Sequence, residues 1–102
     1  MRYRVRFTPE AEADLVRLYA FILERNPTDL AVVERALDAI RAALTTLERL
    51  PFTCRKAATH SPFLRELLIP FGATGDVALF EIDDAETVTV LAVRHQREND
   101  YH

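Results

Sequence analysis

The chain has 102 residues, of which 49% are hydrophobic and 28% charged, and its net charge is −3. These values predict one small folded domain over residues 1–102, and the acidic balance argues against broad binding to nucleic acid, which needs an excess of cations. No apolar run approaches the roughly 20 residues of a membrane span, and the charged N-terminus lacks the apolar stretch of a secretory signal. A single cysteine and the lack of metal-ligand spacings predict a cytoplasmic protein with no disulfide, metal or cofactor.

The first strand is expected at residues 2–7, where basic and apolar side chains alternate strictly. Because successive side chains of a strand point to opposite faces, one face would be apolar and the other basic. The apolar face would carry Tyr3, Val5 and Phe7, and the basic face Arg2, Arg4 and Arg6. This pattern predicts a half-buried strand.

Two helices follow, each with a capping residue at its start and a proline near its end. Thr8 with Pro9 predicts the first N-terminus, and Thr28 with Asp29 predicts the second. Acidic side chains, which the helix dipole favours, lie in the opening turns of the first helix: Glu10, Glu12 and Asp14. Apolar residues recur at helical spacing in both helices: Ala11, Leu15, Leu18, Tyr19 and Ile22, then Leu30, Val33, Leu37, Ile40, Leu44 and Leu47. The short link between the helices predicts an antiparallel hairpin.

The second half of the chain begins with an irregular stretch and continues with three strands. Residues 51–62 show no regular period and are expected to form a loop with a basic cluster of Arg55, Lys56 and His60. Strands are expected at residues 63–71, 77–82 and 87–93, and their short links predict an antiparallel meander. The fold is therefore expected to be α+β, in the order β-α-α-β-β-β, with the helical hairpin packed on one face of an antiparallel β-sheet.

Three stretches of the chain, in this element order, resemble the RelE/ParE toxin superfamily of type II toxin–antitoxin systems. They are YRVRFTPEA at residues 3–11, followed by Asp14 and Leu15, then FLREL at residues 63–67 and VLAVRHQRE at residues 90–98. The resemblance implies a cytoplasmic bacterial toxin that a co-encoded antitoxin neutralises. Members of the superfamily differ in their targets, since RelE-like toxins cut mRNA on the ribosome and ParE-like toxins poison DNA gyrase.

The residues favour the ParE branch. Cleavage of RNA at its 2′-hydroxyl needs a base, an acid and cations that stabilise the phosphorane charge. RelE-like toxins supply these from lysines and arginines on the second and third strands, where this chain has Leu68, Pro70 and Val77. We therefore expect a gyrase inhibitor with no catalytic residues of its own. The alternatives are a ribosome-dependent endoribonuclease, in which His95, Arg97 and Tyr101 would be catalytic, and a module that binds antitoxin but has lost toxicity.

The candidate target-binding residues are Arg94, His95, Arg97 and Arg65. The first three follow the last strand and form a local basic group on an acidic chain. Each has a structural alternative: Arg94 and His95 could brace the fold, and Arg65 could form a surface ion pair with the neighbouring Glu66. Two further basic groups are either solvated or available to partners. The arginines of the first strand could dock an acidic antitoxin tail, and the cluster of residues 55–60 lies in a loop.

Overall fold

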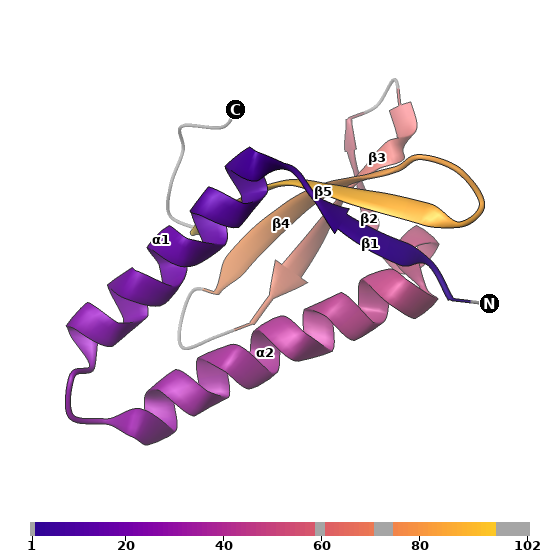
Figure 1. Cartoon of the computed structure of the whole chain (residues 1–102). Coiled ribbons are helices and arrows are strands. Elements are labelled where there is room, and N and C mark those ends of the chain that lie inside the picture. The colour runs from indigo at the N-terminus through magenta and orange to yellow at the C-terminus, as the bar shows by residue number, and fades with distance from the viewer. Residues whose placement is uncertain (1, 59–60, 71–74, 96–102) are drawn as a thin grey trace.

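The computed structural model describes residues 2–58, 61–70 and 75–95. The elements follow the expected order, with a short 3₁₀ turn, η1, and one additional strand (Figure 1). In chain order they are β1 (Arg4–Phe7), α1 (Pro9–Arg25), α2 (Leu30–Arg49), η1 (Pro51–Thr53), β2 (Arg55–Ala58), β3 (Ser61–Ile69), β4 (Asp76–Ile82) and β5 (Thr87–His95). The expected α+β fold of two helices on a sheet is confirmed.

The five strands form one sheet in the order β1-β5-β4-β3-β2. Strands β3, β4 and β5 pair antiparallel, as expected, and the additional strand β2 pairs antiparallel with β3. In contrast, β1 runs parallel to β5, with Val5 opposite Val88 and Phe7 opposite Val90. The sheet is therefore mixed and departs from the expected antiparallel sheet at this one pair. The alternation of side chains indicates which face of a strand is buried, but it holds no information on the direction of the partner strand.

The stretch expected to be a loop contains η1 and the edge strand β2. β2 pairs antiparallel with β3, where Arg55 lies opposite Glu66 and Lys56 opposite Arg65, and the register shifts between Lys56 and Ala58. Arg55 and Lys56 are exposed, whereas His60 lies outside the described residues. The sequence did not reveal this strand because four residues at a sheet edge, interrupted by a register shift, leave no alternating pattern.

Both predicted helix N-termini are confirmed by capping hydrogen bonds. The Oγ1 atom of Thr8 accepts a hydrogen bond from Ala11 N at 3.0 Å, and Oδ1 of Asp29 accepts one from Val32 N at 3.4 Å. At the end of α1, the side-chain nitrogen of Asn26 donates to the carbonyl of Ile22 at 3.0 Å. No described helix is long and apolar enough to cross a membrane.

The core lies between the sheet and the two helices, which cover the same face (Figure 1). Its largest fully buried apolar side chains come from β4, β5 and α2: Phe80, Val88, Val90 and Leu47. A second, smaller cluster of Ile22, Val33 and Ala36 joins the helices near their connecting turn. Leu30, the first residue of the predicted α2 stripe, begins α2 directly after the connecting turn and is 68% exposed, so it does not belong to either cluster.

Candidate functional site

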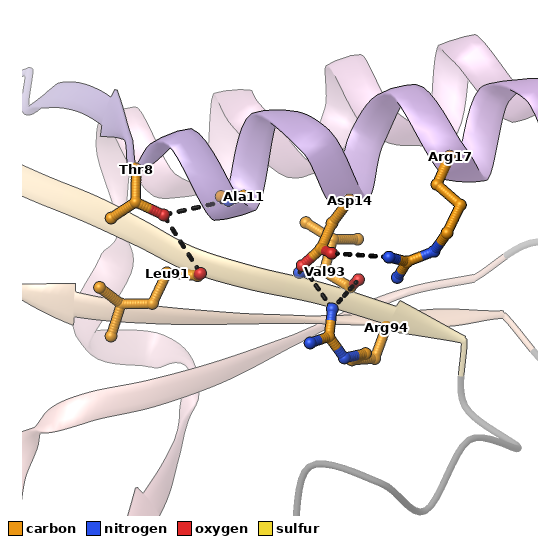
Figure 2. Close-up of polar contacts among 7 residues, drawn as sticks. All are labelled: Thr8, Ala11, Asp14, Arg17, Leu91, Val93 and Arg94. Carbon is orange, nitrogen blue, oxygen red and sulfur yellow. Dashed lines mark hydrogen bonds and ion pairs between the residues drawn. The ribbon is translucent and has the colours of Figure 1, made fainter.

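The end of β5 is held by the start of α1. β1 is only four residues long and pairs with β5 as far as Val90, so among the described residues no strand lies beside this edge of β5 beyond Val90. Two side chains, from the N-cap and the second turn of α1, take the place of the missing strand (Figure 2). The hydroxyl of Thr8 donates to the carbonyl of Leu91 at 3.2 Å, and the Val93 N–H donates to Oδ2 of Asp14 at 2.9 Å. These bonds satisfy backbone groups that would otherwise be left unpaired at a sheet edge.

Asp14 is also the centre of a small charged cluster. The guanidinium of Arg94 lies 2.5 Å from its Oδ2, and that of Arg17, one helical turn further along α1, lies 3.2 Å from its Oδ1 (Figure 2). The Asp14 side chain is only 6% exposed, whereas those of Arg94 and Arg17 are 26% and 58% exposed. A buried carboxylate therefore connects α1 to two consecutive residues of β5 through a backbone amide and a partly buried cation.

The surroundings of Asp14 keep its carboxyl group ionised. Burial raises the pKa of this group, because it removes water from the charged form, but the Val93 N–H and the Arg94 guanidinium stabilise the carboxylate. Arg17 adds a further attraction, and together the three partners hold the pKa of Asp14 below its ordinary value of 3.8. At neutral pH the cluster is therefore a fixed ion pair.

Asp14 was expected only as a favourable charge in the first turns of α1, and not as a site residue. Its position in the sequence nevertheless indicated that Asp14 lies on the buried face of the helix. Asp14 lies three residues after Ala11 and four before Leu18, at a step of the apolar stripe where a hydrophobic residue is expected. A charged residue on the buried face of a helix needs a partner there, because an unpaired buried charge is costly.

The predicted target-binding residues at the end of β5 are only partly within the described structure. Arg94 lies on β5 and directs its guanidinium toward Asp14, a geometry in which it braces the fold. The backbone of His95 ends β5 opposite Asp76. Arg97 and Tyr101 lie outside the described residues. The structure therefore places Arg94 and His95 at the end of β5.

Arg65 belongs to a separate cluster near the opposite edge of the sheet, on β3 beside the edge strand β2. Its Nε donates to the carbonyl of Pro62 at 2.6 Å, a terminal nitrogen donates to those of Cys54 and Phe52 at 2.8 and 3.4 Å, and its guanidinium lies 5.3 Å from the Phe52 ring centre. Glu66, the expected partner of Arg65, instead pairs with Arg55 across β2 and β3 at 3.1 Å. With β4 between β3 and β5, the structure does not bring Arg65 together with Arg94.

Apolar side chains occupy the positions that would carry cations in a RelE-like toxin, and the structure shows where these side chains lie. Leu68 on β3 lies opposite Val77 on β4; Leu68 is 45% exposed and Val77 only 4%. Pro70 follows the end of β3 and is exposed. In the two fully described strands β3 and β4, the one cationic side chain is Arg65, whose donors bind backbone carbonyls. Within the described part of the chain, no group of His, Cys, Asp and Glu side chains is arranged to hold a metal ion.

Comparison with known proteins places this chain in a family. Residues 5–100 match the family model described as "ParE toxin of type II toxin-antitoxin system, parDE". The chain belongs to the ParE toxin family. This confirms the expected superfamily and branch, and it makes the protein a toxin of the type II class, whose partner is an antitoxin.

A solved structure of the chromosomal ParDE toxin–antitoxin system from P. aeruginosa contains a chain with a similar fold. It superposes with a TM-score of 0.64 at 16% sequence identity, covering 91% of this chain and 95% of that one. At this level of identity the likeness concerns the fold, and it agrees with the ParE family assignment. No curated protein sequence matches this ParE-family toxin significantly.

Proposed function

We propose that this toxin acts in the cytoplasm as a ParE-like inhibitor of DNA gyrase and that a cognate antitoxin neutralises it. The observation that carries the proposal is the apolar pair of Leu68 and Val77 on adjacent strands, where an endoribonuclease of the superfamily needs cations. Apolar side chains at these two positions cannot stabilise the charge that develops on a phosphate during RNA cleavage. The net charge of −3 also disfavours binding to ribosomal RNA.

The surface proposed to contact the target is the end of β5, with Arg94 and His95 followed by Arg97. Arginine and histidine side chains suit charge-assisted hydrogen bonds to carboxylates or phosphates of a partner. Arg94 also binds Asp14, so a variant of Arg94 would lose both the proposed target contact and this ion pair. We leave Arg65 out of this surface, since its Nε and one terminal nitrogen donate to the carbonyls of Pro62 and Cys54.

One comparison, made with the same purified toxin, tests the target. The toxin is added to a gyrase supercoiling reaction and, in parallel, to purified ribosomes translating a defined mRNA. We expect supercoiling to be inhibited and the mRNA to remain intact. Codon-dependent cleavage of ribosome-bound mRNA without inhibition of gyrase would establish the endoribonuclease alternative. A toxin that binds its antitoxin tightly but is inactive in both assays would be the module that has lost toxicity.

The proposed contact surface is tested by replacing His95 and Arg97 with alanine, one at a time. Arg94→Ala is less suitable, because it also breaks the ion pair with Asp14. For the two variants we expect weaker inhibition of gyrase with an unchanged melting temperature and unchanged antitoxin affinity. If inhibition survives both changes, or falls only as far as stability falls, the contact surface lies elsewhere.

The antitoxin should stabilise the toxin through mass action, because it binds the folded state. At an antitoxin concentration of about 1,000 times the Kd, the expected gain is about 4 kcal/mol. The measurement is the melting temperature of the toxin alone and in the complex with the product of the neighbouring reading frame. An unchanged melting temperature at saturating concentrations would show that this product is not the cognate antitoxin.

A further inference from the structure

The contact between α1 and β5 fixes the position of the last described residues of β5. Asp14 holds the backbone of Val93 through its amide and the side chain of the next residue, Arg94, through an ion pair (Figure 2). The bond from Val93 to Asp14 spans 79 residues of sequence. Because β1 ends at Phe7, no described strand pairs with β5 on this edge at Val93, and a side chain of α1 performs that function.

A buried ion pair of this kind contributes more to selecting one register of the strand than to the free energy of unfolding. The cost of removing both charges from water offsets most of their attraction, so an apolar pair of similar volume is often as stable. The carboxylate of Asp14, however, is satisfied only when Val93 and Arg94 lie in one register relative to α1. A strand end displaced by one residue would leave a buried charge without its partners, which is strongly unfavourable.

We propose that Asp14 is a positioning residue for target binding: by holding Val93 and Arg94 it sets the position and register of the end of β5 relative to α1. This inference rests on the proposed contact surface at the end of β5. Because the Asp14 side chain is only 6% exposed, it would act through Val93 and Arg94 and not by direct contact with the target. Its replacement should weaken inhibition of the target more than it weakens the fold, whereas a purely structural residue would change both in proportion.

The test compares Asp14→Asn with two control variants. The amide oxygen of asparagine still accepts a hydrogen bond from Val93 N–H, but the charge that holds Arg94 is lost. Asp38→Asn is the matched control, because Asp38 also pairs with an arginine three residues later, Arg41, at 3.1 Å on the exposed side of α2. Val33→Ala is the stability control, since Val33 packs in the small cluster between the helices, away from β5.

The readouts are the toxin concentration that half-inhibits gyrase supercoiling, the antitoxin affinity and the melting temperature. For Asp14→Asn we expect a rise of about tenfold in the half-inhibitory concentration, measured where the variant is fully folded, with antitoxin affinity unchanged. Asp38→Asn should match the wild type in all three readouts. Val33→Ala should melt at a lower temperature and keep wild-type potency. Wild-type potency of folded Asp14→Asn, or a potency loss equal to that of Val33→Ala, would overturn the proposal.

The failure of the proposed function can be distinguished from the failure of this inference. If the wild-type toxin does not inhibit gyrase, the proposed function is wrong, and the same variants are compared by growth arrest after induction, which does not depend on the identity of the target. If Asp14→Asn does not fold, Asp14→Glu replaces it. The added methylene keeps the charge but displaces the carboxylate, so reduced potency at an unchanged melting temperature supports positioning, and full potency contradicts it.

Discussion

Replacing Thr8 with alanine should destabilise the toxin by about 2 kcal/mol, which is large for a partly buried hydroxyl. The hydroxyl makes two bonds: it accepts from Ala11 N at 3.0 Å as the N-cap of α1, and it donates to the carbonyl of Leu91 on β5 at 3.2 Å. Loss of an N-cap costs about 1 kcal/mol, and loss of a hydrogen bond that leaves a carbonyl unpaired costs roughly another 1 kcal/mol.

The assay is equilibrium unfolding in urea, followed by circular dichroism, with a thermal scan in parallel. A loss of about 2 kcal/mol corresponds to a fall of roughly 10 °C in melting temperature for a domain of this size. Thr8→Ser keeps the hydroxyl and should stay close to the wild type. Asp29→Ala is the second control, because Asp29 caps α2 through an exposed bond of 3.4 Å within its own helix and not through a bond to the sheet.

Thr8→Ala and Asp29→Ala together test whether the bond between Thr8 and Leu91 stabilises the fold. Asp29→Ala should cost about 0.5–1 kcal/mol, the lower part of the range for N-caps. If Thr8→Ala costs no more than Asp29→Ala, the bond to Leu91 contributes nothing and the edge of β5 is not stabilised by α1. A large loss of stability in Thr8→Ser would also contradict the explanation, because this variant keeps the hydroxyl that makes both bonds.

Three other measurements probe the charged cluster, the core and the edge strand. The pKa of Asp14 is lowered on folding, so its ionisation stabilises the toxin above about pH 4; the stability difference between wild type and Asp14→Asn should shrink in urea titrations as the pH falls below the ordinary value of 3.8. Leu47→Ala should cost about 2–5 kcal/mol because Leu47 is 1% exposed, whereas Leu30→Ala, at a site 68% exposed, should change unfolding by less than about 0.5 kcal/mol. Arg65→Met should speed amide exchange in β2 by breaking the bond to the Cys54 carbonyl, and should leave gyrase inhibition unchanged; unaltered exchange would show that this bond does not hold the edge strand.

Local chemistry made most of the elements predictable. The alternation at residues 2–7 placed three arginines on the exposed face of the first strand, and Arg2, Arg4 and Arg6 are all exposed. Thr8 and Asp29 marked the helix starts because a capping side chain bonds to an amide only three residues away. Such features depend on neighbours within one or two turns, so the sequence is sufficient to predict them.

The candidate site was predicted only in outline. The chain order and the resemblance indicated the end of the last strand, and Arg94 and His95 are indeed the final described residues of β5. The sequence did not show that Arg94 would turn toward α1, nor that Arg65 would bind the carbonyls of Pro62 and Cys54 instead of Glu66. An arginine has five donors and many possible acceptors, and its choice depends on which acceptors the folded backbone brings within reach.

Periodicity, capping and motif order predicted the two helices, four of the five described strands and the family before any contact between elements was known. The three-dimensional arrangement was needed to establish that β1 lies parallel to β5, that β2 extends the opposite edge, and that Asp14 is a buried partner of Val93 and Arg94. The physical reason is distance along the chain. A contact across 79 residues has no local pattern, and its free energy is realised only after the sheet and helices have come together.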